Sequence, residues 1–137
     1  MNIEQARFNM IEQQIRTWNV LDASVLALLS HIKREDFVPA AHRALAFADL
    51  ELPLQADTQA VADGRCMLAP KVEARMLQDL ALQPTDSVLE VGTGSGYMAA
   101  LLASQAGKVL SLEIVPELAQ QARENLRKAG VTKVEVR

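Results

Sequence analysis

The sequence has few of the residues that cross-link proteins or hold metal ions. Its 137 residues include one cysteine and two histidines. The lone thiol of Cys66 excludes an intramolecular disulfide, and His31 and His42 lack the spacing of a zinc site, so we expect no metal. Both absences favour a reducing compartment, and we expect a cytoplasmic protein.

Long apolar runs and an excess of positive charge are also missing. No run approaches the roughly 20 apolar residues of a membrane-spanning helix, and residues 1–5 lack the basic flank and apolar core of a signal peptide. With 14 Lys and Arg against 17 Asp and Glu, the net charge is −3. This balance excludes binding driven by bulk positive charge, so we expect neither nucleic acid nor a membrane as partner. The oligomeric state is not predicted.

Half of the residues are apolar, enough for one hydrophobic core, and the first third is predicted to be helical. Apolar residues at helical spacing predict a first helix over 3–18, with Trp18 as a core anchor: Phe8, Ile11, Ile15 and Trp18. Asp22 is placed to cap a second helix. We expect the charged run 33–36 after it to be a solvated turn, and Pro39 to open a short third helix. We expect this helical first third of the chain to form a cap or lid.

Residues 50–66 show neither a helical nor a strand period, which predicts a long loop. Long loops in compact domains are uncommon and are often functional, so this one is a candidate for substrate contact. A tolerated insertion is the alternative.

Strands and helices alternate from Pro70 onward. The predicted order is helix 70–82, strand 87–91, helix 96–106, strand 108–113, helix 116–129 and strand 131–137. This order predicts an α/β fold with a Rossmann-like, doubly wound parallel sheet. Three parallel strands are too few to close a core, so we expect the sheet to be incomplete and the chain to be the N-terminal portion of a longer protein.

Three glycines, Gly92, Gly94 and Gly96, lie between the first predicted strand of this sheet and the helix after it. Glycines here permit a tight turn and a close approach of the backbone to a ligand, and the helix N-terminus offers free N–H groups. A dinucleotide loop would need a glycine at position 97, where the chain has Tyr97, and a P-loop would need a Gly-Lys-Ser/Thr ending. Glu113 ends the next strand, where an acidic side chain can bind a ribose diol.

The loop from Glu90 to Tyr97, together with Glu113, resembles the first two motifs of class I S-adenosylmethionine-dependent methyltransferases. Stretches across nearly the whole chain are similar to the protein-L-isoaspartate O-methyltransferase family: Ile15–Arg16, Val20–Asp22, Arg34–Pro39, Gly94–Tyr97 and Leu112–Glu113. The resemblance implies S-adenosyl-L-methionine as cofactor and a protein or peptide with isoaspartyl residues as substrate. The reaction would methylate the carboxylate of the damaged residue for protein repair. The implied cofactor contacts are Glu90, Gly92, Thr93, Gly94, Ser95, Gly96, Tyr97 and Glu113.

The chain departs from this family before Pro70. The family carries a Gly-Gln-Thr segment and a later serine whose hydroxyls lie beside the methyl-transfer site. Here Gly64 is kept, Arg65 replaces the glutamine, Cys66 replaces the threonine, and Leu68 stands at the serine position. The catalytic residues therefore stay unassigned.

Two alternatives remain open: a methyltransferase-like protein with an altered substrate, and a non-catalytic module that binds a cofactor or partner. A nicotinamide-dependent oxidoreductase is a third hypothesis, against which Tyr97 argues. We expect residues 1–137 to form one methyltransferase domain, with a helical cap and substrate loop over 1–68 and the first part of the cofactor-binding region over 69–137. This segment alone is expected to bind the cofactor weakly and to catalyse poorly.

Overall fold

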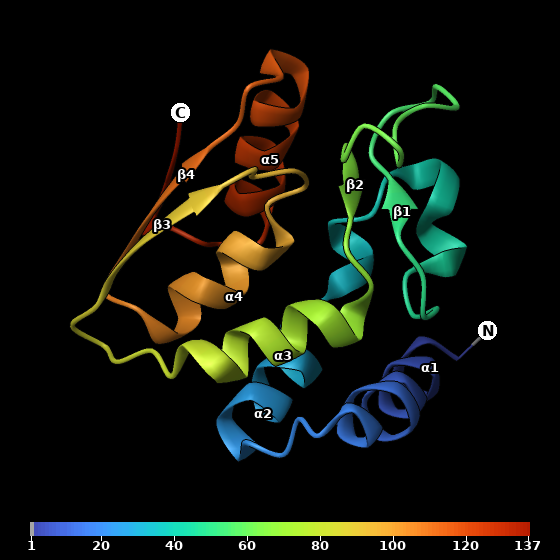
Figure 1. Ribbon diagram of the computed structural model, residues 1–137, viewed down its shortest axis with the longest axis vertical. Coiled ribbons are helices and arrows are strands. Elements are labelled where there is room, and N and C mark those ends of the chain that lie inside the picture. The colour runs from blue at the N-terminus through green and yellow to red at the C-terminus, as the bar shows by residue number, and fades with distance from the viewer. Residues whose placement is uncertain (1) are drawn as a thin grey trace.

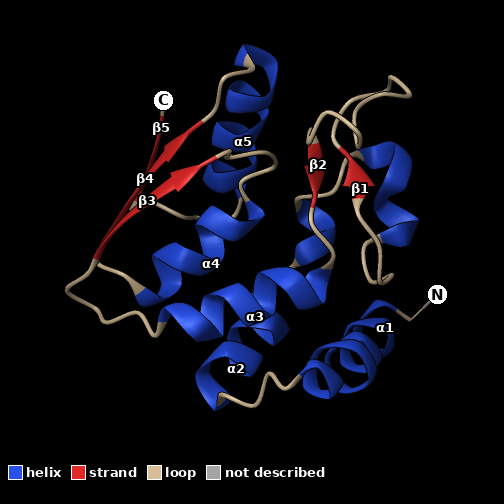
Figure 2. Cartoon of the chain, in the orientation of Figure 1, coloured by secondary structure: helices blue, strands red, loops and turns tan. Residues whose placement is uncertain are grey.

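A computed structural model describes residues 2–137 and shows a helical N-terminal half beside an α/β half (Figure 1). The α-helices are α1 (Ile3–Met10), α2 (Ala23–His31), α3 (Pro70–Leu80), α4 (Tyr97–Gln105) and α5 (Pro116–Lys128). The strands are β1 (Leu52–Pro53), β2 (Cys66–Met67), β3 (Ser87–Val91), β4 (Lys108–Leu112) and β5 (Val134–Val136). The predicted α/β class and element order are confirmed (Figure 2).

The first predicted helix forms, but only part of its predicted apolar face is buried: Ile11 and Ile15 are buried, whereas Phe8 and Trp18 are not. After α1 the chain makes a π-helical turn at Ile11–Ile15 and a 3-10 turn at Arg16–Trp18. The wider π turn shifts the later residues around the axis. Phe8 is 58% exposed and Trp18 45%, so the prediction of Trp18 as a core anchor is wrong. Its ring instead lies 4.8 Å from the ammonium of Lys71.

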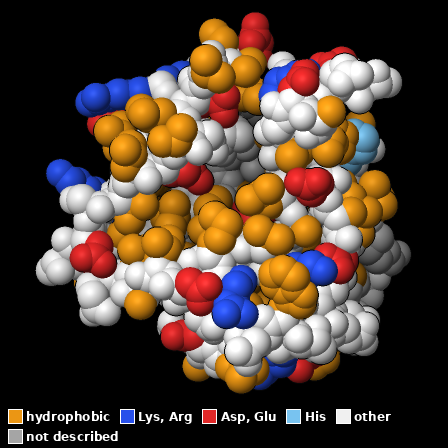
Figure 3. Space-filling model, viewed as in Figure 1, with side chains coloured by type: hydrophobic (Ala, Val, Ile, Leu, Met, Phe, Trp, Pro, Cys, Tyr) orange, Lys and Arg blue, Asp and Glu red, His pale blue; other side chains and the backbone are white. Residues whose placement is uncertain are grey.

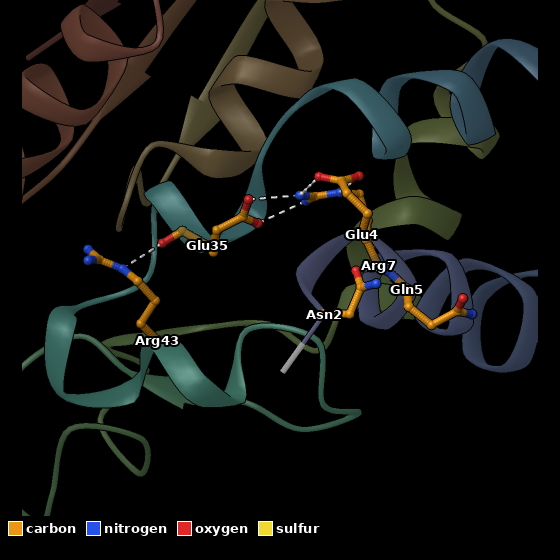
Figure 4. Close-up of polar contacts among 6 residues, drawn as sticks. All are labelled: Asn2, Glu4, Gln5, Arg7, Glu35 and Arg43. Atoms are coloured by element: carbon orange, nitrogen blue, oxygen red, sulfur yellow. Dashed lines mark hydrogen bonds and ion pairs between the residues drawn. The ribbon is translucent and has the colours of Figure 1, made fainter.

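Residues 33–36 are not a solvated turn as predicted, because two of their charges are buried. Arg34 and Glu35 in the 3-10 turn Arg34–Asp36 are 1% and 7% exposed. The Glu35 carboxylate accepts two hydrogen bonds of 2.8 Å from the Arg7 guanidinium of α1 (Figure 4). The Arg34 guanidinium donates to the Glu73 carboxylate of α3 at 2.7 Å. Each buried charge thus has an opposite partner, which is the condition for burying it.

The helices around this turn largely follow their sequence signals. The Asp22 carboxylate caps α2 as predicted, accepting from the backbone N–H groups of Ser24 and Val25. The third predicted helix begins directly after Pro39, as expected, but it is a 3-10 helix, Ala40–Leu45, and ends before the predicted Ala48. Helix α3 begins at Pro70 and ends two residues early, because Ala81 adopts a left-handed conformation.

The long loop predicted over 50–66 is closed at its base by a two-stranded antiparallel ladder. Leu52 pairs with Met67, and Pro53 pairs with Cys66. We call residues 52–67 the hairpin. Arg65 holds its loop together, since its guanidinium donates to Gln55, Asp57 and Asp63 at 2.6–3.0 Å.

The larger sheet is parallel with the order β3-β4-β5, and its two faces differ. Side chains such as Val109 and Ser111 on one face are buried in the core that contains α4. The opposite face carries exposed apolar residues, among them Leu89 (60%) and Val91 (79%). A short run such as Ser87–Val91, bounded by turn residues and glycines, is expected to form a strand buried on both faces. That expectation is wrong for one of the two faces of β3.

The core that joins the two halves is continuous. It contains Met10 and Leu29 from the cap, Phe37 from the turn after α2, and Tyr97 and Leu101 from α4. The Phe37 and Tyr97 rings meet edge to face with centroids 5.6 Å apart. Among the helices of residues 2–137, none has the length and apolar character required to cross a membrane.

Candidate functional site

The glycine loop lies between β3 and α4, where the sequence predicted it, and all three glycines have a positive φ. At Gly94 and Gly96 packing also favours a residue without a side chain. An added Cβ at Gly94 would lie 3.1 Å from Leu54 Cδ1, and one at Gly96 would lie 3.2 Å from Leu126 Cγ. For Gly92, with φ +94°, nothing lies within 4 Å of that position. Gly92 therefore leaves open space beside its backbone, as the approach of a ligand requires.

Glu113 follows β4 and closes the loop from the other side. Its carboxylate accepts a 2.8 Å hydrogen bond from the N–H of Gly94 and a 3.1 Å bond from that of Val115. The carbonyl of Leu112 accepts the N–H of Gly92 at 2.7 Å. The two predicted cofactor motifs are thus brought together. Since a carboxylate has about four lone-pair sites, Glu113 can still accept from a ligand hydroxyl.

Glu90, on β3, lies in a buried hydroxyl network. The Ser111 hydroxyl donates to its carboxylate at 2.5 Å, and Thr93 Oγ1 lies 2.6 Å from Ser111 Oγ. Burial raises the pKa of Glu90 to about 7, although the Ser111 hydrogen bond acts to lower it. The carboxyl group can therefore change charge near neutral pH.

Sequence reasoning missed Ser111, although a signal for it existed. A serine interrupts the apolar β4 strand, and the strand register places it directly opposite Glu90. Such a cross-strand pair of polar side chains inside a sheet points to a hydrogen bond between them.

The side chains of Thr93, Ser95 and Tyr97 are buried, at 4%, 6% and 2% exposure. Ser95 Oγ accepts from the Tyr97 N–H at 3.3 Å. These side chains hold the loop in place, so contacts of these three residues with a ligand would come from their backbone.

Cys66 lies in β2 of the hairpin, and Leu68 directly follows that strand. The Leu68 side chain is 37% exposed and offers no hydrogen bond, while its carbonyl accepts one from Arg34. Cys66 Sγ lies 3.7 Å from a Glu51 oxygen. Burial and the Glu51 charge raise the pKa of the Cys66 thiol, so this cysteine is a poor nucleophile.

Two hollows adjoin the site. A groove of about 590 Å³ lies between the cap, the hairpin and α5 and reaches Gly94 and Ser95; Figure 3 shows the surface hollowed between α5 and the hairpin. A shallower hollow of about 390 Å³ lies at the carboxyl ends of the strands and includes Gly92, Glu113 and the 93% exposed Ile114. Within residues 2–137, no group of three or more His, Cys, Asp or Glu side chains is arranged to hold a metal ion.

Comparisons with known proteins agree with these motifs. The chain is 44% identical over 130 residues to a protein-L-isoaspartate O-methyltransferase of Methanoculleus marisnigri, covering 95% of this chain and 56% of the relative. It is 43% identical over 129 residues to that of Aeropyrum pernix, covering 92% and 47%. The chain thus spans about half the length of the curated relatives it matches.

Solved structures show the same fold. A protein-L-isoaspartate O-methyltransferase superposes with a TM-score of 0.76 at 20% identity, covering 98% of this chain and 41% of that one. A putative enzyme of this name from Plasmodium falciparum, solved in complex with S-adenosyl-L-homocysteine, gives 0.74 at 18% identity, covering 100% and 62%.

A family model described as protein-L-isoaspartate(D-aspartate) O-methyltransferase matches residues 5–137. This match favours the methyltransferase hypothesis over a nicotinamide-dependent oxidoreductase. The chain belongs to the protein-L-isoaspartate(D-aspartate) O-methyltransferase family.

Proposed function

We propose that the protein of which this chain is at least a part is an S-adenosylmethionine-dependent methyltransferase that methylates the carboxylate of isoaspartyl residues in proteins, for their repair. The observation that carries the proposal is the pair Glu90 and Glu113, joined by the glycine loop in a chain of this family. An open backbone at Gly92 beside two carboxyl groups suits a ligand that carries both hydroxyl groups and a positive charge.

Each part of the site has its own share in binding that cofactor. Glu113 would accept from the ribose hydroxyls, and Ile114, which is exposed beside it in the same hollow, would offer an apolar surface to the base. The backbone of residues 92–96 and the carboxylate of Glu90 would hold the amino-acid end. The cofactor would supply a methyl group on a sulfonium: the acceptor oxygen would form a bond to the methyl carbon as the carbon–sulfur bond breaks, and S-adenosylhomocysteine would leave.

The protein's task in this reaction is positioning. A substrate carboxylate is ionised at neutral pH, so the acceptor needs no general base. Alignment of acceptor and methyl group can supply up to roughly 7–11 kcal/mol of the barrier. Opposite charges neutralise as the methyl moves, which favours a site that excludes water.

We also propose how the parts of the chain divide this work. Residues 1–68 form the cap and the substrate loop, and residues 69–137 form the first part of the cofactor-binding region, within one methyltransferase domain. The substrate polypeptide enters along the groove that reaches Gly94.

We further propose a cytoplasmic location, because the lone free Cys66 agrees with a reducing environment.

The experiment is transfer of a labelled methyl group, with the full-length protein, to an isoaspartyl peptide and to its aspartyl twin. We expect transfer to the isoaspartyl peptide alone. Transfer to neither peptide, with S-adenosylmethionine still bound in a titration, would support a binding module. Transfer to another carboxylate would support the altered substrate that Leu68, with no hydrogen-bonding group, suggests.

A further inference from the structure

A single buried guanidinium, that of Arg34, contacts four segments that meet beside the glycine loop. Its Nε donates to the carbonyl of Ala46 at 2.9 Å, and its Nη1 donates to the Glu73 carboxylate at 2.7 Å. Its Nη2 donates to the carbonyl of Leu68 at 2.9 Å. The guanidinium carbon lies 5.0 Å from the centroid of the Tyr97 ring. Arg34 is 1% exposed.

Two of these contacts tie the substrate side of the site to the cofactor side. Leu68 directly follows β2 and stands where the family has its serine, while Tyr97 begins α4 at the end of the glycine loop. Arg34 reaches both from the turn after α2. Its planar guanidinium has donors in fixed directions, so the positions of the Leu68 carbonyl and the Tyr97 ring are set relative to one another.

Glu73, in the first turn of α3, fixes the guanidinium in this orientation. Its carboxylate is 6% exposed, and burial raises its pKa against the opposing effect of Arg34. A buried ion pair of this kind is weak evidence for stability, because an apolar pair of similar volume often folds as well. The Arg34–Glu73 pair is therefore better explained by the orientation that it gives to the guanidinium than by a contribution to folding.

We propose that Arg34, held by Glu73, is a positioning residue for methyl transfer. It sets the distance between the backbone at Leu68, beside which the acceptor lies, and the glycine loop that holds the methyl donor. The inference rests on the proposed function. Because the Leu68 side chain cannot hydrogen-bond, placement of the main chain carries more of the alignment here than where a serine is present.

The test uses three forms of the full-length protein: unaltered, R34M/E73M and R7M/E35M. The last is a matched control, because Arg7 is also buried (3% exposed), paired with a glutamate and placed over a ring, that of Phe47, at 5.2 Å. The Arg7 side chain bonds Glu4 and Glu35 within the cap. Both double variants remove a whole ion pair and leave no lone buried charge.

We expect R34M/E73M to fold and to bind S-adenosylhomocysteine nearly as the unaltered protein does. Its kcat for an isoaspartyl peptide should fall about 100-fold, since a misplacement of about 1 Å has an effect of that size. R7M/E35M should keep its kcat within a few-fold. The single variant R34K keeps the positive charge but lacks the planar set of guanidinium donors. Its kcat should lie between those of R34M/E73M and the unaltered protein.

A second measurement does not depend on activity. Amide hydrogen exchange in the hairpin, residues 52–67, should be about tenfold faster in R34M/E73M and unchanged in R7M/E35M. Unchanged kcat and unchanged exchange in R34M/E73M would overturn the proposal. If the unaltered protein transfers no methyl group, the proposed function fails, while the exchange result still decides whether Arg34 sets the hairpin's position.

Discussion

Glu90 combines two properties that act against each other. Its position on β3 surrounds it with protein, which raises its pKa to about 7, while the Ser111 hydroxyl hydrogen-bonds its ionised form. Between about pH 4.5 and 7 the folded chain holds a proton that an unfolded chain has lost. The contribution of Glu90 to the free energy of unfolding therefore falls as the pH rises through this range.

Cofactor binding should expel that proton. With a pKa of about 7, roughly half of Glu90 is protonated at pH 7, and a cationic ligand selects the ionised form. Titration calorimetry with S-adenosylmethionine, in two buffers of different ionisation enthalpy, should show release of up to about half a proton. E90Q should release none, whereas E117Q, at an exposed position on α5, should behave as the unaltered protein does. Equal release by E90Q would show that another group titrates.

Alanine variants of two glycines can distinguish the effect of backbone strain from the loss of a ligand contact. Gly92 and Gly64 both have a positive φ, and nothing lies within 4 Å of an added Cβ at either position. An alanine at each should lower the free energy of unfolding by a similar 1–2 kcal/mol or so. Only G92A should weaken binding of S-adenosylhomocysteine tenfold or more, measured by titration. Equal effects of G64A and G92A on binding would remove Gly92 from the site.

At the scale of elements, the sequence predicted the type and order of the helices and strands better than it predicted which face of each element is buried. Repeating α/β elements are set by local period and by caps such as Asp22, which act within a few residues. The exposure of Trp18 follows a π-helical turn at Ile11–Ile15 that no local pattern marks. The burial of Arg34 depends on Glu73, which is 39 residues away and follows an irregular hairpin.

The candidate site divides in the same way. The glycine loop and Glu113 were predictable, because their spacing is a local consequence of a strand, a turn and a helix. Ser111 and Arg34 were not identified, because each acquires its role from a partner on another element.

The hairpin loop should depend on Arg65. Its side chain donates to Gln55, Asp57 and Asp63 from the base of the loop. R65A should make residues 55–64 more sensitive to limited proteolysis. Its effect on the free energy of unfolding should be small, since these ion pairs are exposed to solvent. R127A, which removes an exposed pair on α5, serves as control. Unchanged cleavage of R65A would mean that the ladder alone orders the loop.

At the scale of the whole molecule, one face of the parallel sheet stands out. Its apolar side chains are exposed by 60% at Leu89, 79% at Val91 and 36% at Leu112, and Ile114, two residues beyond the end of β4, is 93% exposed. Strand β3 also has an unpaired edge in the described part of the chain. A contiguous apolar surface next to an open strand edge favours association.

The 137-residue chain studied alone should therefore self-associate at micromolar concentration. L89K/V91K should shift it toward the monomer in sedimentation velocity, because the charges enter the exposed face and disturb no packed neighbour. L80K changes an exposed apolar residue on α3 and should leave association unchanged. A monomeric unaltered chain, or equal behaviour of the two variants, would contradict this expectation.

The close approach of Leu54 to Gly94 joins the hairpin to the glycine loop. An added Cβ at Gly94 would lie only 3.1 Å from Leu54 Cδ1, so any side chain at position 94 would displace the base of the hairpin. The sequence allowed at position 94 is therefore limited by a segment 40 residues earlier in the chain, as well as by the backbone conformation of the loop itself.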